Sequence, residues 1–285
     1  MQSQLLKPRR SLLFVPGNRL TLYTKALKTA ADVVCIDLED SIPTEQKDET
    51  RKGVINFFQK TSLTNKTEIV LRINSLQTRE GIADINALLE SKSAPHSIML
   101  TKIDNAEEVK LIDKILSTPT LATTRIQVIV ETNSGLDDVM AIAHSSERID
   151  TLLFGGVDMV ADLRSSFDWD SLLYSRSKII HAGASADIDT MDMPELDIDN
   201  LRELEQTTTA VAKLGFTGKA AIHPTQIPII NRCFTPSEET INTAKRVVDA
   251  YEASKDGLTV VDGKLLEKPF VRSMYRILKT LEKDN

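Results

Sequence analysis

Eight short apolar runs recur along this chain, and their repetition is the feature that most limits how it can fold. Each run is nearly continuous rather than alternating with polar residues, which is typical of strands that are covered on both faces in a parallel sheet. The runs cover residues 12–15, 33–36, 69–73, 98–100, 126–130, 152–154, 186–190 and 219–222, and the seventh is the weakest.

Stretches with helical periodicity separate these runs. Helices are expected at 44–58, at 105–116 with Asn105 as the N-cap, and at 201–214 with a stop at Gly215. Eight strand–helix units in 285 residues predict an α/β fold, a (β/α)8 TIM barrel, whose usual length is about 250 residues. A doubly wound open sheet is the alternative, although it does not require eight evenly spaced strands.

The barrel is expected to end before the chain does. Residues 9–235 are predicted to form the TIM-barrel catalytic domain, and 236–285 a C-terminal helical extension that acts as a lid. Helices are expected at 238–255 and 271–282. This segment is surplus to an eightfold barrel, so we expect it to cap a site, either its own or a neighbour's.

Bulk properties exclude several classes of protein. The net charge of −6 argues against general affinity for nucleic acids. No apolar run approaches the ~18 residues that span a bilayer, and residues 1–10 lack the apolar core of a secretory signal. Cys35 lies inside an apolar run, which favours a buried reduced thiol over a disulfide with the distant Cys233. A cytoplasmic protein without membrane or nucleic-acid partners is the simplest interpretation.

Two carboxylates follow neighbouring runs. Glu131 comes after the run at 126–130, and Asp158 comes shortly after the run at 152–154. If these runs are adjacent parallel strands, both carboxylates converge at one end of the barrel, where barrel enzymes place their chemistry. Carboxylate oxygens suit Mg²⁺, which keeps open positions for substrate oxygens. The sequence therefore predicts a Mg²⁺ site at Glu131 and Asp158.

Other charged residues are expected at the same ends. They are Asp37, Glu39, Asp40, Arg72, Lys102 and His223, with Asp189 as a doubtful addition. Lys102 and Asp40 fit a helix cap or a solvated loop charge equally well, and His223 is more often structural than catalytic. Arg72 has a stronger case, because a guanidinium within an apolar strand needs an anionic partner. That partner is Glu39, Asp40 or a substrate carboxylate held by two hydrogen bonds.

Two glycine-containing segments are candidates for binding phosphate. One is Pro16-Gly17 after the first run, and the other precedes the last run and ends at Lys219. Neither is a P-loop or a dinucleotide fingerprint. With basic residues nearby they would serve a phosphorylated group such as coenzyme A. The predicted binding residues are Arg10, Pro16, Gly17, Lys25 and Lys219.

Six ordered motifs resemble the citrate lyase β-subunit family of the HpcH/HpaI aldolase superfamily, which includes stand-alone bacterial citramalyl-CoA and malyl-CoA lyases. The motifs are RSLLFVPG at 10–17, DLEDS at 37–41, LRIN at 71–74, ET at 131–132, FGGVD at 154–158 and GFTGKAAIHPTQ at 215–226. The resemblance runs from about residue 9 to residue 270. It is specific for the family and much less so for the substrate.

The resemblance implies a TIM barrel that forms a homo-oligomer, usually a trimer. It implies Mg²⁺ held by Glu131 and Asp158, and a keto-acid carboxylate bound by Arg72. The segment containing Asp37 and Glu39 would lie close to the metal and its waters.

Further residues take roles from the resemblance. Lys47 and Arg51, which follow the acidic motif, are interpreted as structural. A C-terminal acidic residue, here Glu267, would reach over the neighbouring subunit's site. The family usually has Asp at this position and commonly has Ala where this chain has Asn133. Both departures affect the assignment of the substrate, whereas the predicted metal ligands Glu131 and Asp158 are unchanged.

These features predict a Mg²⁺-dependent carbon–carbon lyase acting on a 3-hydroxy-acyl-CoA thioester. The favoured reaction converts (S)-citramalyl-CoA to pyruvate and acetyl-CoA, with Arg72, Asp37, Glu39 and Glu267 as catalytic residues, and with Arg72 and Glu131 binding substrate. Alternatives are the β subunit of citrate lyase acting on a citryl group of an acyl carrier protein, a malyl-CoA lyase, a thioesterase, and a non-catalytic CoA-binding regulator.

Overall fold

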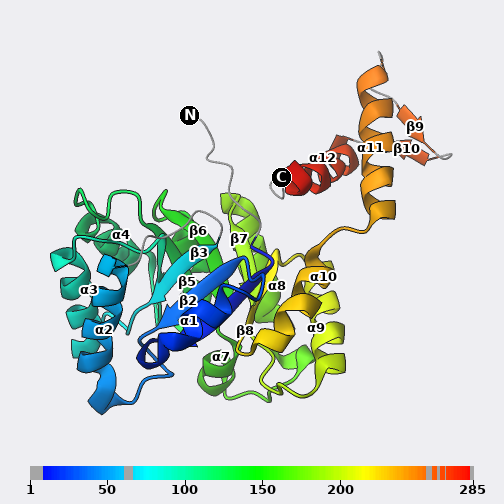
Figure 1. Ribbon diagram of the computed structural model, residues 1–285. Coiled ribbons are helices and arrows are strands. Elements are labelled where there is room, and N and C mark those ends of the chain that lie inside the picture. Colours follow the sequence, from blue (N-terminus) through cyan, green and yellow to red (C-terminus); the bar gives the residue numbers. More distant parts are fainter. Residues whose placement is uncertain (1–8, 61–66, 255–258, 262–263, 267, 283–285) are drawn as a thin grey trace. The chain divides into compact units, whose positions relative to one another are not determined.

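A closed parallel barrel of eight strands forms the centre of the molecule in the computed structural model, which describes residues 9–60, 67–254, 259–261, 264–266 and 268–282 (Figure 1). Each strand pairs with the next along the chain, and β1 closes the barrel by pairing with β8. The predicted TIM barrel is therefore confirmed. The strands are β1 (Ser11–Pro16), β2 (Val33–Asp37), β3 (Glu68–Arg72), β4 (Ser97–Leu100), β5 (Arg125–Val130), β6 (Ile149–Phe154), β7 (Asp189–Asp192) and β8 (Gly218–Ala221).

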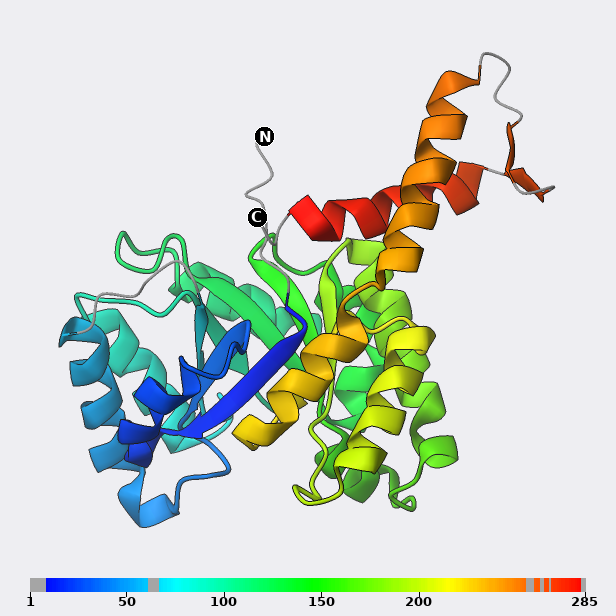
Figure 2. The same cartoon turned by 45° about the vertical axis from the view of Figure 1, so that its right-hand side comes forward.

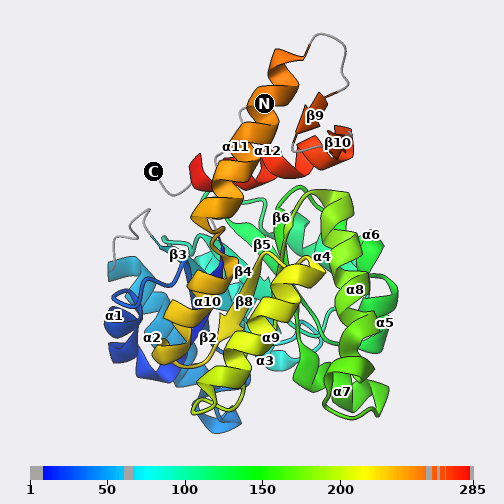
Figure 3. The ribbon, with the colours of Figure 1, turned by 90° about the vertical axis from the view of Figure 1, so that its right-hand side faces the viewer.

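Helices surround the strands (Figure 3). The α-helices of this part are α1 (Thr21–Ala26), α2 (Lys47–Lys60), α3 (Arg79–Glu90), α4 (Ala106–Ile115), α5 (Asn133–Asp137), α6 (Val139–Ala143), α7 (Gly156–Leu163), α8 (Trp169–Ala186), α9 (Leu201–Leu214) and α10 (Ile227–Phe234). Short 3-10 turns are η1 (Gly17–Arg19), η2 (Thr44–Gln46) and η3 (Pro224–Gln226).

Burial follows the two faces of the strands. One cluster of buried side chains fills the barrel, and a larger one lies between the strands and the helices. Within the first cluster, Cys35 is fully buried and is a free thiol, as predicted, and Cys233 is also free. Continuous apolar runs thus arise because both faces of each strand are covered.

Local signals set several element boundaries as expected. The Asn105 side chain accepts hydrogen bonds from the backbone N–H groups of Glu107 and Glu108 and so caps α4. Helix α9 ends at Gly215, whose φ of 125° favours glycine. The predicted bounds of the seventh strand were wrong, because α8 continues to Ala186 and ends at Asp187, whose backbone is left-handed. Strand β7 therefore begins only at Asp189.

This shift corrects the doubtful assignment of Asp189 to the catalytic end. Asp189 is the first residue of β7 and lies at the opposite end of the barrel, where it accepts a hydrogen bond of 3.1 Å from Arg9. Arg9 is 6% exposed and also pairs at 2.6 Å with Glu68 and with Asp150. This cluster closes the barrel with paired charges, which keeps a buried guanidinium satisfied.

The described residues after Phe234 belong to a second compact unit. It contains α11 (Glu238–Ala253), a hairpin of β9 (Thr259–Val261) and β10 (Lys264–Leu266), and α12 (Lys268–Glu282). Figure 2 shows α12 running across α11, and buried Val247, Leu266 and Val271 form a small core. The two helices confirm the expected helical character, whereas the hairpin was not anticipated. Its action as a lid stays a prediction.

Among the described helices, none combines the length and the apolar character needed to cross a bilayer.

Candidate active site

Two carboxylates lie at the ends of neighbouring strands. Glu131 directly follows β5, and Asp158 lies in the first turn of α7 after β6, whose Phe154 is in register with Val130. The Glu131 side chain is 3% exposed and the Asp158 side chain 41%. The predicted convergence is therefore seen in the structure, with one buried carboxylate and one accessible from solvent.

The ammonium group of Lys102 lies between these carboxylates. Its Nζ atom contacts Asp158 Oδ1 and lies 3.5 Å from Glu131 Oε2. The backbone N–H of Lys102 also donates a hydrogen bond of 2.8 Å to Glu131 Oε1. Lys102 is therefore neither a helix cap nor a solvated charge, the two ordinary interpretations of its sequence position. It joins the two carboxylates in one site.

Gly155 makes room for Glu131. A Cβ atom at Gly155 would lie 2.4 Å from the Cβ atom of Glu131 and 2.8 Å from its Oε2 atom, closer than real Cβ contacts. The close approach of the two strand ends therefore requires glycine at position 155, the first glycine of the FGGVD motif.

Burial and charge change the pKa values at this pair. Burial raises the pKa of Glu131 to about 7, because its charged form loses water; Lys102 opposes this shift and Asp158 adds to it. Burial alone would lower the pKa of Lys102, but the charges of Glu131 and Asp158 outweigh it and the pKa is raised. A cation is therefore favourable between the two carboxylates.

Arg72 ends β3 and is held mainly by Asp37. Its Nε and Nη2 atoms donate to the two Asp37 oxygens at 2.6 and 2.7 Å. Its Nη1 atom lies 3.2 Å from Glu39 and 3.2 Å from Asp40. The sequence predicted the two weaker partners and missed Asp37, the principal one. The guanidinium also lies 4.8 Å from the centre of the Phe14 ring.

The acidic residues around Arg72 differ in the direction of their pKa shifts. Burial would raise the pKa of Asp37, but the charge and hydrogen bonds of Arg72 outweigh it and the pKa is lowered. Burial raises the pKa of Glu39 to about 8, opposed by Arg72 and increased by Asp40. The site therefore places a carboxyl group of lowered pKa on one edge of Arg72 and a more basic carboxyl group near the other.

A second layer fixes the segment that carries Glu39. Lys47 Nζ donates to the backbone carbonyl oxygen of Glu39 at 3.0 Å and also contacts the Asn74 side chain. Arg51 pairs with the buried Asp84 at 2.5 Å, and Asn74 Nδ2 donates to Asp84 at 2.7 Å. Lys47 and Arg51 thus have the structural pairing expected of them.

The donors at Glu131 and Asp158 fit a hard divalent cation. Both are carboxylates, and the Lys102 ammonium already occupies the space between them as a positive charge. Across the described part of the chain, no three His, Cys, Asp or Glu side chains are grouped to hold a metal. A cation here would therefore take two protein ligands and leave positions for water and substrate oxygens.

Comparisons with known proteins identify the family of this chain. The model of the HpcH/HpaI aldolase/citrate lyase family matches residues 10–224. The chain belongs to this family. It is 31% identical to the citrate lyase subunit beta of Escherichia coli (strain K12), over 99% of this chain and 96% of that protein. It is 28% identical to the mitochondrial citramalyl-CoA lyase of Rattus norvegicus, over 95% of this chain and 85% of that protein.

A solved structure with bound ligands is also similar to this chain. The protein CitE from Mycobacterium tuberculosis, in complex with magnesium, acetoacetate and coenzyme A, superimposes with a TM-score of 0.78 at 27% identity, covering 97% of each chain. The relatives are named lyases, so the predicted enzyme class, a carbon–carbon lyase, is confirmed. The substrate is not decided at this level of identity.

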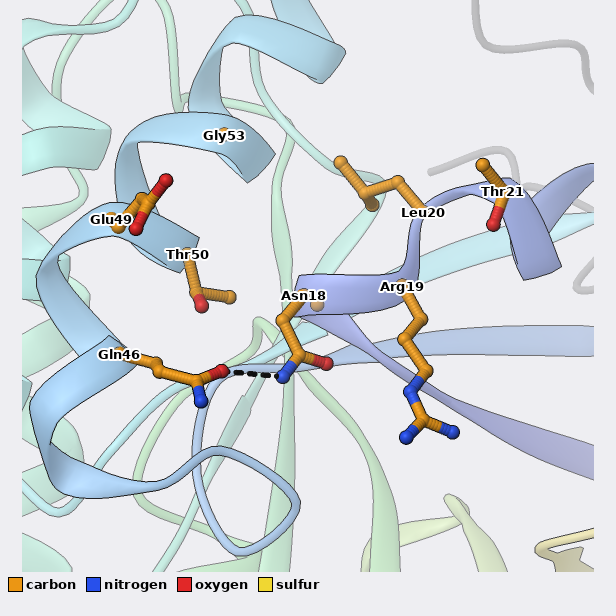
Figure 4. A pocket seen from close by; sticks show the side chains of 9 residues that line it. Asn18, Arg19, Leu20, Thr21, Gln46, Glu49, Thr50 and Gly53 are labelled. Carbon is orange, nitrogen blue, oxygen red and sulfur yellow. Dashed lines mark hydrogen bonds between the residues drawn. The ribbon is translucent and has the colours of Figure 1, made fainter.

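Three of the residues predicted to bind a cofactor lie near one rim of the barrel. Pro16 ends β1, Gly17 begins η1, and Lys25 is exposed on α1. A cavity of about 500 Å³ lies between η1 and α2, with Gly17, Arg19 and Thr50 among its lining residues. Figure 4 shows this pocket, in which Asn18 is hydrogen-bonded to Gln46.

Arg10 and Lys219, the other two, lie elsewhere in this member of the family. Arg10 precedes β1, at the end opposite the carboxylate pair, and donates to both oxygens of Asp32 at 2.9 and 3.0 Å. Lys219 is 1% exposed and bonded to Asp192 at 2.7 Å. Because both cations are already paired, their placement favours structural roles and does not support their predicted contact with coenzyme A.

Three further residues singled out in the sequence remain. His223 caps η3, and its ring accepts a hydrogen bond from the backbone N–H of Thr225, which agrees with the structural interpretation. Glu267 lies outside the described residues. Asn133 is an exposed residue at the start of α5.

Proposed function

We propose that this family member is a Mg²⁺-dependent lyase that cleaves a 3-hydroxy-acyl-CoA thioester, with Glu131 and Asp158 as the metal ligands. The observation that carries the proposal is that a buried carboxylate, Glu131, and an exposed one, Asp158, lie on either side of the cationic Lys102. The complex of CitE with magnesium and coenzyme A supports the same ligand chemistry in this family. When bound, Mg²⁺ supplies Lewis acidity toward the substrate's oxygens.

Arg72 would bind the substrate carboxylate. Asp37 holds one edge of the guanidinium in place by two hydrogen bonds. The Nη1 atom of Arg72 faces Asp40, whose side chain is 59% exposed. A substrate carboxylate could then take the place of Asp40, with Arg72 already oriented by Asp37. Such a preset guanidinium lowers the entropy cost of orienting the substrate.

Glu39 and Glu267 would handle protons. Glu39, near the guanidinium and 11% exposed, is the candidate that takes the proton from the substrate hydroxyl oxygen as the carbon–carbon bond breaks. The products are a 2-keto acid and the enolate of an acyl-CoA. We propose that Glu267 returns a proton to the enolate carbon.

Coenzyme A would lie along the rim near Pro16 and Gly17. The cavity between η1 and α2 offers space there, with Arg19 on its lining and Lys25 on the adjacent helix. Phosphate groups would meet these cations and the backbone N–H groups of the turn. We include neither Arg10 nor Lys219 in this proposed site.

The favoured substrate is (S)-citramalyl-CoA, which would give pyruvate and acetyl-CoA. The test is one coupled assay with citramalyl-, malyl- and citryl-CoA in the presence of Mg²⁺. Fastest release of pyruvate and acetyl-CoA from citramalyl-CoA supports this choice. Faster cleavage of malyl-CoA would contradict the assignment of citramalyl-CoA as the preferred substrate. Release of free CoA without acetyl-CoA would identify a thioesterase. Absence of turnover together with CoA binding would support the non-catalytic regulator.

The β subunit of citrate lyase is the second candidate, favoured by the 31% identity to the Escherichia coli subunit. That role would require a citryl group on an acyl carrier protein. Cleavage of a citryl-carrier thioester at least as fast as citramalyl-CoA, with co-purification of the carrier, would select it. We also propose that the protein is a homo-oligomer, specifically a trimer, and that it is located in the cytoplasm.

A further inference from the structure

Lys102 occupies the position between the two carboxylates that we assign to the metal. Although its side chain is 29% exposed, the Nζ atom itself is buried and faces Asp158 and Glu131. Two carboxylates brought together without a cation repel each other, so the ammonium group makes this arrangement of the carboxylates favourable.

The backbone of Lys102 is shaped for the same site. Its φ is 54°, in the left-handed region that side-chain-bearing residues seldom adopt. Three other described non-glycine residues have positive φ. Arg164 and Asp187 each end a helix and Ala30 precedes β2, whereas Lys102 lies between β4 and α4. The unusual backbone places the Lys102 N–H 2.8 Å from Glu131 Oε1. Strain retained beside a functional carboxylate points to a role in positioning it.

We propose that Lys102 is a positioning residue that serves as a tethered counter-ion, neutralising Glu131 and Asp158 in the metal-free protein and withdrawing its ammonium group when Mg²⁺ binds. This inference rests on the proposed function, in which these two carboxylates bind the metal. An ammonium and a divalent cation cannot share one position because they repel strongly at contact distance. Lys102 therefore keeps the carboxylates in place before binding and weakens metal affinity by competition.

The test is the affinity for Mn²⁺, measured by titration calorimetry on the native chain and on Lys102→Met. Methionine keeps an unbranched side chain and the backbone N–H but removes the charge. Mn²⁺ should bind at least about tenfold more tightly to the variant, equivalent to about 1.4 kcal/mol. The thermal midpoint of the metal-free variant should fall, and the increase in midpoint on adding Mn²⁺ should grow.

Two other substitutions serve as matched controls. Lys110→Met also removes one positive charge, but from an exposed lysine on α4 that pairs with Glu107, so the Mn²⁺ affinity should not change. Lys102→Arg keeps a cation between the carboxylates and should stay near the native affinity. Lys102→Gln gives a second neutral variant if the methionine variant fails to fold.

If the neutral Lys102 variants bind Mn²⁺ with unchanged or weaker affinity, Lys102 does not compete with the metal and the proposal is wrong. A separate result tests the metal site itself. If the native chain does not bind Mn²⁺, or if Glu131→Ala binds it as well as the native chain, the carboxylate assignment is wrong and the role of Lys102 fails with it. Tight native binding that Glu131→Ala removes, but that Lys102→Met leaves unchanged, contradicts the role of Lys102 alone.

Discussion

Side chains at the catalytic end of the barrel are held as charged groups that orient one another. Arg72 is fixed by Asp37 through two hydrogen bonds, and Glu131 is fixed by the backbone and the ammonium group of Lys102. These contacts set the direction of each group before any ligand arrives. Preset orientation of this kind is a major source of catalytic rate.

The substitution Arg72→Lys tests this at the level of one residue. Lysine keeps the charge but cannot match both oxygens of Asp37 with a planar pair of donors, so Asp37 would be left poorly satisfied. At saturating Mg²⁺ we expect kcat/KM to fall roughly 30-fold or more, which corresponds to a loss of at least about 2 kcal/mol of transition-state stabilisation.

The matched control is Arg232→Lys on α10, whose pair with Glu205 is exposed and should contribute little. Steady-state kinetics with the preferred acyl-CoA provide the measurement. Near-native values for Arg72→Lys would assign Arg72 a purely structural role and would remove the proposed grip on the substrate.

Residue-level prediction from the sequence succeeded where position along a strand decides the outcome. Glu131 and Asp158 could be paired because neighbouring parallel strands end on the same side. Asp37 ends β2 in register with Arg72 at the end of β3, so the same reasoning could have identified this pair. Lys102 as the bridge could not be predicted, because side-chain directions after a strand depend on the local backbone. In Lys102 that backbone is left-handed, and no common sequence signal marks this for a lysine.

At the scale of elements, the strand ends are packed so closely that particular positions accept only glycine. Gly155 separates β6 from Glu131 at the end of β5, and a methyl group there would meet both Glu131 and Ile129. The carboxylate pair therefore depends on the spacing between two strand ends as well as on its own residues.

We predict that Gly155→Ala displaces Glu131 and weakens Mn²⁺ binding at least about tenfold, at a stability cost of about 1–3 kcal/mol from overpacking. Gly53→Ala is the control, since its added Cβ would meet no atom within 4 Å. That control should leave Mn²⁺ affinity unchanged and stabilise α2 by about 0.5–1 kcal/mol. Native Mn²⁺ affinity in Gly155→Ala would show that this spacing does not control the metal site.

Elements were largely predictable because eight apolar runs and the intervening helical periodicity reflect burial on both strand faces. The seventh strand was displaced because residues 186–188 are compatible with either a helix end or a strand, and the left-handed Asp187 decides between them. The hairpin of β9 and β10 has three residues in each strand, too short for a clear periodic pattern.

At the scale of the whole molecule, the barrel is complete by β8, and the described part of the second unit has a small core. Among the described residues, Val247, Leu266 and Val271 form that core. So small a core seldom supports an independent fold. We therefore propose that this unit acts on a neighbouring subunit, as the family resemblance implies, with Glu267 completing the neighbour's site.

Subunit mixing tests this arrangement. Glu131→Ala and Glu267→Gln should each be inactive alone, since each removes a required carboxyl group. When the two variants are mixed under conditions that exchange subunits, some oligomers would contain one intact site, and activity should reappear. If exchange is verified by mass and no activity returns, each subunit uses its own tail.

The central claim is that Glu131 and Asp158 bind the metal that drives cleavage. The most direct measurement is the rate of acetyl-CoA formation from citramalyl-, malyl- and citryl-CoA by EDTA-treated protein, before and after Mg²⁺ is added, in the native chain and in Glu131→Ala. We predict that at least one thioester is cleaved only after Mg²⁺ is restored, and only by the native chain. Cleavage that persists in EDTA, or full activity of metal-free Glu131→Ala, would contradict the account.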